Sequence, residues 1–372
     1  MNISIRGTGI ISAAGVGVAD NWNNTAEGRR FWSTDDATKL PVYALPYLPA
    51  AGRPADYIRT HRVDRTVALA LHAAEEAVAQ AGWHGQDFAV LVGCSRGPTT
   101  AWEAAHQTYR EGKVLPVRTS PTTTLGSIAF ALADYFGVSS LSDGLSVTCS
   151  SGFHALVHGV ALLRAGMADR VLVGGTEAPL TPFTLRQMEG LRIYASPTPG
   201  EEYACRPFAT PATGMVVGEG AGFLALERAP QTGSLGILGL GFSREQARSA
   251  TGISREGTAL QSSMRQATIG AATPDLILAH APGTLRGDEA ERRAITSVFP
   301  ETLPPVLSLK WATGHTFGAS GPLALVMATE MVRRNAVIVL PYGPATEVPS
   351  PPRRVLVNAT GFGGNAVSVL IG

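Results

Sequence analysis

The 372-residue sequence predicts an α/β fold made of two copies of one strand–turn–helix unit. Short apolar runs that read as buried strands alternate with alanine-rich runs at helical spacing, which is the pattern of α/β layering. The two halves of the chain also repeat the same order of elements, and such a repeat indicates a duplicated unit. We therefore predict an N-terminal unit over residues 1–229 and a C-terminal unit over residues 230–372.

The first unit contains one strong helix and two strong strands. The helix spans residues 67–81 and is terminated by a glycine, the residue that helix C-termini favour. The apolar runs 88–93 and 170–175 are short enough to be buried strands. A second helix is predicted from just after Cys149 as far as Gly166.

The second unit repeats this pattern with different residues. Three short apolar runs read as buried strands, at residues 276–279, 305–308 and 354–357, and a helix is predicted over 322–333. Three proline- and glycine-rich spans are predicted to be surface loops: residues 40–54, 197–201 and 341–352.

The repeat pairs two turns that carry chemically able side chains. Residues 146–152 and the helix after them are echoed by residues 309–321 and their helix. The first turn carries Cys149 and the second carries His315. If the two units pack about a pseudo-twofold axis, these two side chains converge on one site.

The bulk composition excludes several classes of function. A formal net charge of +1 argues against electrostatic binding to nucleic acid. No apolar run approaches the length needed to cross a bilayer, and the N-terminus begins as a strand rather than a signal region, so we expect a cytoplasmic protein without a membrane partner. Cys94, Cys149 and Cys205 are odd in number and lack CxxC spacing, which predicts neither a disulfide framework nor a metal site.

Cys149 lies where a strand turns into a helix. The free N–H groups and the positive dipole end of a helix N-terminus favour a thiolate. Since this effect is worth about 0.3–1 and at best ~2 kcal/mol, it lowers a thiol pKa by roughly one unit, and a neighbouring histidine must contribute the rest. A buried cysteine that acts as a small apolar side chain is the other interpretation of the residue alone.

Histidine is the natural partner of a reactive thiol. Two of the eight histidines, His280 and His315, follow apolar strands in turn-like segments, where open α/β sheets place their sites. Lys310 is unusual in an apolar strand, and a buried ammonium needs a carboxylate, which Asp288 or Glu291 could provide.

Two glycine-rich segments have different interpretations. Residues 361–364 predict a tight turn whose backbone N–H groups could line an anion site, or a plain loop. Residues 218–222 lack the strand–GxGxxG–helix context, so we do not interpret them as a nucleotide site.

Together these motifs resemble the β-ketoacyl-acyl carrier protein synthases, condensing enzymes of the thiolase fold. The resemblance runs from the first strand to the last and implies a duplicated unit layered α-β-α-β-α. The segments that carry it stand in the family's order and approximate spacing: residues 146–152, 171–182, 205–208, 218–222, 279–291, 310–321 and 361–365.

The resemblance implies a role for each reactive residue. Cys149 would take an acyl group from an acyl carrier protein as a thioester. His280 and His315 would promote decarboxylation of a malonyl thioester and stabilise the enolate oxygen. Lys310 and Glu291 would be the pair that orders the site.

It also implies how substrates are held. Backbone N–H groups of Cys149 and Phe362 would form the oxyanion hole, and Phe362, with Gly363 in its turn, would gate the acyl pocket. Thr284 would contact the phosphopantetheine arm, and Arg192 the acidic carrier protein. The family implies no cofactor or metal of the chain's own, and a homodimer or a heterodimer with a ketosynthase-like subunit.

The sequence departs from the family at several places. After His280 the expected Gly-Thr-x-Thr becomes residues 281–284 with one threonine missing, and residues 209–213 have lost the family's charges. Residues 40–58 and 94–119 are trimmed where acyl-pocket and dimer contacts normally lie. These changes favour a specialised synthase, of a polyketide or polyene pathway, over housekeeping fatty-acid elongation.

Three other functions of related proteins fit these residues less well. A noncatalytic partner of the chain-length-factor type usually replaces the nucleophilic cysteine, whereas Cys149, both histidines and Lys310 are present here. A degradative thiolase needs a second cysteine in the C-terminal glycine-rich turn, which has none. A starter-unit synthase would pair one histidine with an asparagine.

Overall fold

The computed structural model describes residues 2–198, 200–229, 235–246, 252–343 and 351–372. No helix in these ranges is long and apolar enough to cross a membrane. The predicted boundary between units falls beside residues 230–234, which lie outside the described residues, so it stays a prediction. The predicted loop at 341–352 is likewise described only in part.

Two sets of five strands form the main sheet, and both sets have the same topology. The first set runs β6-β5-β7-β9-β1 and the second β12-β11-β13-β14-β10, which is the order 3-2-4-5-1 in each when its strands are numbered along the chain. In each set the strand numbered 5 is antiparallel to its neighbours. Strand bounds in the first set are β1 Asn2–Ser12, β5 Ala89–Gly93, β6 Ser142–Leu145, β7 Arg170–Glu177 and β9 Gly220–Ala229. In the second they are β10 Gly236–Arg244, β11 Leu276–Leu278, β12 Val306–Leu307, β13 Val355–Gly361 and β14 Asn365–Ile371.

The two sets meet where β1 pairs with β10, antiparallel, with Ile3 opposite Ile237. A short strand, β2 (Gly15–Val16), pairs back on β1. The identical topology of the two sets supports the duplication that the repeated turns predicted.

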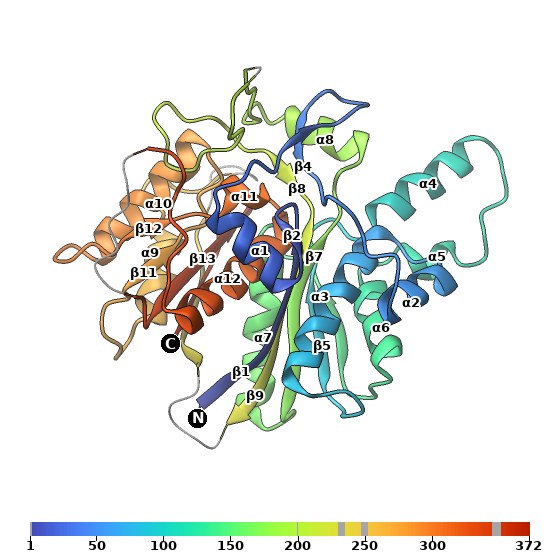
Figure 1. Ribbon diagram of the computed structural model, residues 1–372, viewed down its shortest axis with the longest axis horizontal. Helices are drawn as coiled ribbons and strands as arrows, with labels where there is room; N and C mark the ends of the chain where they lie inside the picture. The colour runs from blue at the N-terminus through green and yellow to red at the C-terminus, as the bar shows by residue number, and fades with distance from the viewer. Residues whose placement is uncertain (1, 199, 230–234, 247–251, 344–350) are drawn as a thin grey trace.

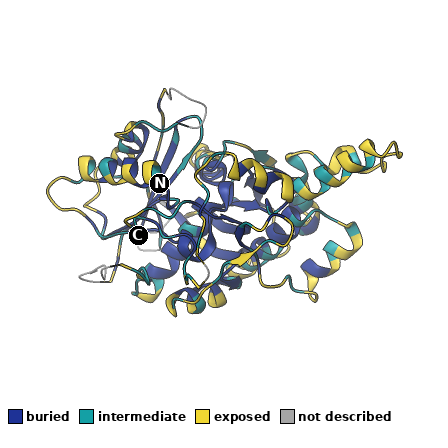
Figure 2. Ribbon diagram, turned by 90° about the horizontal axis from the view of Figure 1, so that it is seen from above, coloured by how far each residue is buried: buried dark blue, intermediate teal, exposed yellow. Residues whose placement is uncertain are grey.

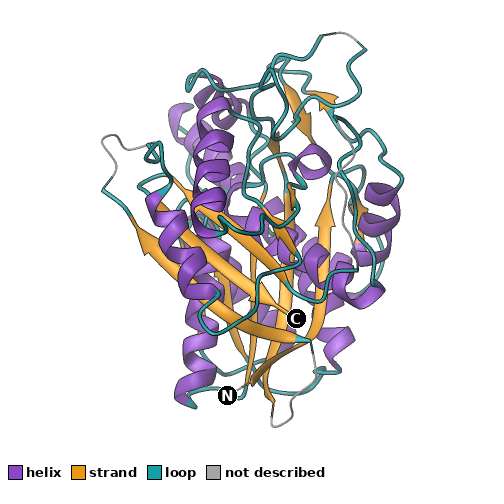
Figure 3. Cartoon of the chain, turned by 90° about the vertical axis from the view of Figure 1, so that its left-hand side faces the viewer, coloured by secondary structure: helices purple, strands orange, loops and turns teal. Residues whose placement is uncertain are grey.

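Helices make three layers around these strands (Figures 1 and 3). Helices α7 (Ser151–Ala165) and α12 (Ser320–Arg334) contact each other and the strands of both sets, so they form the central layer. Helices α3 (Arg65–Ala81) and α6 (Gly126–Phe136) cover the outer face of the first set. Helices α9 (Thr258–Ala267) and α10 (Leu285–Val298) cover that of the second. The predicted α-β-α-β-α layering is confirmed.

The strands alternate between the central and the outer cores. On β7, Val171 and Val173 join the central cluster, whereas Leu172 faces α3 and α6. On β13, Val357 joins the central cluster and Leu356 the cluster around α9. Because successive side chains of a strand point to opposite faces, apolar runs without polar interruptions are required where both faces are buried.

The helices begin and end close to the predicted positions. Helix α3 starts two residues earlier than predicted because Asp64 caps it, accepting a hydrogen bond from Thr66 N at 2.7 Å. It ends at Gly82 in the left-handed conformation, at φ 70°. Helix α7 ends in the same way at Gly166, with φ 71°.

The prediction of a surface loop over residues 40–54 was wrong in part. Residues 40–54 contain β4 (Pro41–Tyr43), which pairs with β3 (Ser33–Thr34) and β8 (Val217–Gly218) in a second, small sheet. Tyr43 is fully buried and donates a hydrogen bond from its hydroxyl to Trp311 O at 2.7 Å. A proline at the first position of a strand does not interrupt the ladder, which is why the composition misled.

Glycines allow the two units to approach closely at the central layer. A Cβ on Gly152, in α7, would overlap Pro322 and lie 2.6 Å from Gly318 O. A Cβ on Gly218 would overlap Thr313 O. The glycines of the 218–222 segment therefore serve packing between the units.

Candidate active site

Cys149 occupies a strained turn between β6 and α7. Thr148 has φ 50°, a left-handed conformation that β-branched residues rarely adopt. Its hydroxyl donates to Phe362 O at 3.1 Å, and its carbonyl accepts from Ser151 Oγ at 2.6 Å. These contacts fix the backbone that presents the thiol.

The thiol is buried in an apolar cluster. Cys149 is 7 % exposed. The cluster, called here the Cys149 cluster, consists of Val42, Cys149, Leu185, Met188, Met215, Val217 and Phe317, with Leu40, Ala44, Leu180, Leu191 and Tyr194 packed against it. Its members come from β4, β8, η1 (Phe317–Ala319) and α8 (Pro182–Glu189), elements far apart in the sequence.

Burial reverses the expected ionisation of the thiol. Burial first, and then the negative charge of Glu177, raise the pKa of Cys149 to about 12, although Lys310 and Arg96 oppose this. Desolvation can move a pKa by several units, whereas a helix terminus contributes roughly one. The expected lowering of the thiol pKa was therefore wrong, because burial outweighs the effect of the helix terminus.

His280 and His315 face each other. Their ring centroids are 5.1 Å apart at an interplanar angle of 84°. His280 follows β11, and His315 lies between α11 (Lys310–Thr313) and η1. Burial and the positive charge of Lys310 hold the pKa of both imidazoles well below the usual range, so both are neutral at pH 7.

Hydrogen bonds determine which ring nitrogens are free. Ser320 Oγ accepts from Thr316 N at 3.1 Å and lies 3.1 Å from both Thr316 Oγ1 and His315 Nδ1. With the Thr316 hydroxyl donating to it, Ser320 directs its own hydrogen to His315 Nδ1. Lys310 Nζ lies 3.5 Å from His280 Nδ1, and an ammonium can only donate. We therefore assign the proton of each neutral ring to Nε2.

Two residues connect His315 to the Cys149 cluster. Val217 forms a backbone bridge with His315, in which Gly218 N donates to His315 O at 3.1 Å. The Phe317 ring lies 5.2 Å from the His315 ring, centroid to centroid. Because Val217 and Phe317 belong to the same cluster as Cys149, the two repeated turns border one site.

Lys310 and Glu291 meet at His280 without forming a direct pair. Lys310 Nζ donates to His280 O, while Glu291 accepts from His280 N at 3.0 Å and from Ala281 N at 2.7 Å. Asn358 Nδ2 donates to Glu291 at 3.1 Å. Among the described residues no carboxylate lies within ion-pair distance of Lys310. Lys310 begins α11 rather than lying in a strand, and burial lowers its pKa to about 8.

A second carboxylate holds the segment after His280. Asp288 accepts from Gly283 N at 3.0 Å and from Phe208 N at 2.7 Å. Burial raises its pKa to about 6. Thr284, predicted to contact the phosphopantetheine arm, is buried at the N-terminus of α10, beside Asp288.

The glycine-rich hairpin between β13 and β14 packs on the Cys149 turn. A Cβ on Gly361 would overlap Thr148 Oγ1 and lie 3.1 Å from Cys149 N. Phe362 is therefore next to the Cys149 turn, and its carbonyl accepts the hydrogen bond of the Thr148 hydroxyl. Gly363 adopts φ 85°, and its carbonyl accepts from Arg244 Nε at 3.1 Å.

Arg192 is exposed and lies three residues after the end of α8 (Pro182–Glu189). Its place beside a helix that contributes Leu185 and Met188 to the Cys149 cluster leaves it free for a surface contact. The structure does not bring it into the group around the histidines.

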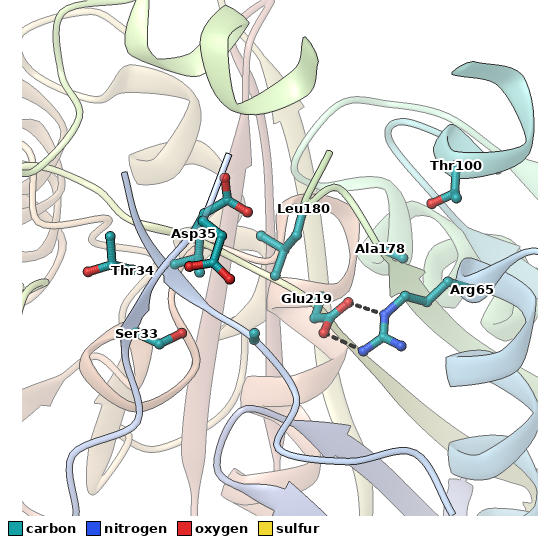
Figure 4. Close-up of a pocket in the computed structure, with 11 residues that line it drawn as sticks. Ser33, Thr34, Asp35, Arg65, Thr100, Ala178, Leu180 and Glu219 are labelled. Carbon is teal, nitrogen blue, oxygen red and sulfur yellow. Dashed lines mark hydrogen bonds and ion pairs between the residues drawn. The ribbon is translucent and has the colours of Figure 1, made fainter. Parts of the chain in front are cut away.

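A cavity of about 330 Å³ adjoins the Cys149 cluster (Figure 4). Val42, Ala44 and Leu180 belong to both the cavity wall and the cluster. The opposite wall is polar, with Asp35 facing a bidentate ion pair between Arg65 and Glu219 whose two N–O distances are 2.6 Å. Within the described residues no group of three or more His, Cys, Asp or Glu could hold a metal ion.

Sequence reasoning missed three residues of this site. Ser320 and Phe317 lie inside the motif that carries His315, and Asn358 directly follows a predicted strand. The only feature of the sequence that pointed to them was their position beside a candidate residue or a predicted strand. Their function as hydrogen-bond or packing partners depends on contacts across the fold.

Comparison with known proteins places the chain in a family. Residues 1–232 match the beta-ketoacyl synthase N-terminal domain and residues 236–340 the beta-ketoacyl synthase C-terminal domain. The chain is 26% identical to "Putative polyketide beta-ketoacyl synthase 1" of Streptomyces cyaneus, over 99% of this chain and 97% of that protein. It is 27% identical to "3-oxoacyl-[acyl-carrier-protein] synthase 2" of Rhizobium meliloti (strain 1021), over 99% and 98%.

Solved structures agree on the fold. The chain superposes on the ishigamide ketosynthase/chain length factor with a TM-score of 0.87, at 21% identity, covering 100% of this chain and 98% of that one. The two family domains together span more than nine-tenths of the sequence. The chain belongs to the β-ketoacyl synthase family, the acyltransferases that form carbon–carbon bonds.

Proposed function

We propose that this protein condenses an acyl group held on Cys149 with a malonyl thioester, both delivered on the phosphopantetheine arm of an acyl carrier protein. The observation that carries the proposal is the neutral His280–His315 pair, 5.1 Å apart, bordering the apolar cluster that encloses the Cys149 thiol. A relative named for an acyl-carrier-protein substrate supports the carrier.

The first step is acyl transfer. The Cys149 sulfur attacks the carbonyl carbon of the incoming thioester, the bond to the pantetheine sulfur breaks, and the thiol proton passes to the departing thiol. Because the thiolate is the nucleophile, this buried thiol must lose its proton as the attack proceeds. The hairpin that carries Phe362 and Gly363 lies against Cys149 and would provide the second oxyanion donor and the gate.

The second step is decarboxylative condensation. The malonyl thioester loses CO₂, and the electron pair of that bond becomes an enolate whose oxygen carries negative charge. His280 and His315, each with its proton on Nε2, can donate two hydrogen bonds to this oxygen. The enolate carbon then attacks the acyl carbon, the bond from that carbon to the Cys149 sulfur breaks, and the departing thiolate takes a proton from water to restore the neutral thiol.

Lys310 and Glu291 act as positioning residues in this scheme. They hold the backbone of His280 on both sides: Lys310 donates to its carbonyl, and Glu291 accepts from its N–H. Thr284 would contact the pantetheine arm, and the exposed Arg192 would meet the acidic carrier protein. The polyketide relative and the sequence departures favour a specialised pathway.

A second ketosynthase-like chain would complete the enzyme. Helix α4 (Thr99–Arg110) projects from the body and has no buried residue, yet it carries Trp102 and Tyr109, 54% and 66% exposed (Figures 1 and 2). Strand β6 is an edge of the main sheet, and Phe130, on the helix beside it, is 60% exposed. Apolar surface beside an open edge is typical of an interface. A solved relative is a ketosynthase/chain length factor.

The reaction is tested by intact-mass analysis after incubation with acyl-carrier protein and then malonyl-carrier protein. The expected result is an acyl adduct that malonyl-carrier protein discharges. Cys149→Ala should abolish the adduct, whereas Cys205→Ala should retain it. No adduct on the wild type, alone or with a candidate partner subunit, would contradict the proposal, and an adduct on Cys149→Ala would contradict the residue assignment.

The partner is tested by light scattering coupled to size exclusion. A homodimer or a dimer with a ketosynthase-like subunit is expected, and Trp102→Glu should weaken it. A monomer at every concentration, still monomeric with candidate subunits, would contradict the dimer.

A further inference from the structure

Glu177, the last residue of β7, joins the two units beside the nucleophile. It is fully buried, and its Oε1 accepts hydrogen bonds from Ser95 N and from Gly318 N, the latter at 3.2 Å. Ser95 belongs to the turn after β5 in the first unit, and Gly318 lies three residues after His315 in the second. One carboxylate oxygen therefore holds the turn that follows His315 against the first unit.

The other oxygen of this carboxylate has no ordinary partner. Within the described part of the chain, no hydrogen bond of ordinary geometry reaches Oε2 although it is buried, while the Cys94 thiol and the Arg96 N–H lie close enough to the carboxyl group to lower its pKa. A buried carboxylate left partly unsatisfied is costly, and burial raises the pKa of Glu177 to about 7. A neutral side chain that makes the same contacts would cost less, so the retained carboxyl group needs an explanation.

The charge of Glu177 acts on two thiols. It raises the pKa of Cys149, second only to burial, and also that of the buried Cys94. Arg96 and Lys310 have the opposite effect on Cys149. Arg65 and Glu219, on the neighbouring elements, neutralise each other in their ion pair. Burial is thus the main cause of the raised thiol pKa, and one anion and two cations shift it further in opposite directions.

We propose that Glu177 is a positioning residue of the condensation site, which fixes the turn after His315 and whose negative charge opposes loss of the Cys149 proton. This inference rests on the proposed role of Cys149 as the nucleophile. The chemical steps above do not use Glu177, and it never needs to touch the substrate. Its carboxylate would protect the thiol from side reactions until an acyl thioester arrives.

The test is the rate at which iodoacetamide alkylates Cys149, measured by peptide mass so that Cys94 and Cys205 are counted separately. It needs no carrier protein, so its outcome is independent of whether condensation occurs. In Glu177→Gln, alkylation above about pH 8 should be about threefold to tenfold faster than in the wild type, equivalent to half to one pKa unit. Below about pH 6 the two rates should converge, because the wild-type carboxyl group is then protonated too.

Two variants separate charge from position. Glu177→Asp keeps the charge, so its alkylation rate should stay near the wild-type value, while its shorter side chain should slow condensation. Glu330→Gln removes a buried carboxylate on α12 that pairs with Arg333 and Arg334, and it should leave alkylation of Cys149 unchanged.

The wild type alone gives a second measurement if the variants do not fold. Its alkylation rate should rise by less than tenfold per pH unit around pH 7, because ionisation of Glu177 opposes that of the thiol. A full tenfold rise per unit through this range would overturn the proposal. So would a Glu177→Gln acceleration that is the same at every pH, or one that Glu330→Gln reproduces.

Discussion

The turns around Cys149 and His315 occupy equivalent places in the two units but have opposite surroundings. Cys149 follows β6 and directly precedes α7, inside a cluster of apolar side chains. His315 follows β12 at a greater distance, because α11 is inserted before it and brings Lys310. Around His315 and His280 most polar atoms have partners, among them Ser320, Lys310 and Glu291. The duplicated scaffold thus places the candidate nucleophile on one turn and hydrogen-bonding side chains on the other.

Burial leaves the thiol of one turn and the imidazoles of the other uncharged, although it shifts their pKa values in opposite directions. It raises the pKa of the Cys149 thiol and lowers the pKa of both imidazoles. Desolvation disfavours whichever form is charged, so the acid and the bases all rest in their neutral forms. The thiol and the two imidazoles therefore carry no charge until the substrate enters, and the fixed donors then stabilise the charge that develops.

The largest expected effect comes from removing a donor. His315→Ala should slow condensation about 10²–10³-fold, because a donor to the enolate oxygen is lost. Acylation of Cys149 should persist, since the thiol belongs to the other unit's turn. Single-turnover assays that follow acylation and discharge separately would measure both steps. Equal slowing of acylation and of discharge would contradict the assignment of these two steps to different turns.

The lowered pKa of Lys310 can be tested through the pH dependence of the free energy of unfolding. Its folded pKa of about 8 lies below its ordinary value of 10.5, so the unfolded state binds more protons between these two values. The free energy of unfolding should therefore rise with pH across this window, by up to about 3 kcal/mol relative to Lys310→Met. The charged lysine destabilises the fold below about pH 8, and this cost is removed above about pH 10.5.

Urea unfolding of the wild type and Lys310→Met at several pH values provides the measurement. The two proteins are compared by how steeply the free energy of unfolding changes with pH, because the variant also loses the hydrogen bond to His280 O at every pH. Parallel pH profiles of the two proteins would contradict the lowered pKa.

The contact between the two turns can be tested by overpacking. A Cβ on Gly152 would overlap Pro322 and approach Gly318 O, so Gly152→Ala should destabilise the protein by about 1–3 kcal/mol. The matched control is Gly190→Ala, at a residue with ordinary helical φ whose nearest atoms lie 3.4 Å from the new methyl group. That variant should be near neutral. Equal unfolding midpoints for the two variants would contradict tight packing at the central layer.

The smallest effect is expected at Ser320. Ser320→Ala removes the partner of His315 Nδ1 and should lower condensation about tenfold, because the ring then samples both tautomers. The pH profile of discharge should move with it, whereas the acylation rate should not. An effect as large as that of His315→Ala would instead indicate that the turn itself had collapsed.

Local sequence patterns were enough to predict most of the helices and strands and the candidate site residues. Periodicity predicted helix α3 to within two residues, and the repeated turns predicted the duplication whose topology the strands share. Cys149, His280 and His315 stood out because strand-to-turn positions with small neighbours are local features. The small sheet that includes β4 was missed, since its proline-rich sequence reads locally as a loop.

Only the tertiary structure decided the electrostatics. The helix N-terminus next to Cys149 predicted a lowered pKa, but side chains from four separate elements desolvate the thiol and raise it. Lys310 was expected to pair with a carboxylate, yet it meets Glu291 only through the backbone of His280. Glu177 drew no attention until Ser95 and Gly318 converged on it. Desolvation and charge interaction depend on distances in space, which residues far apart in the chain establish when they fold.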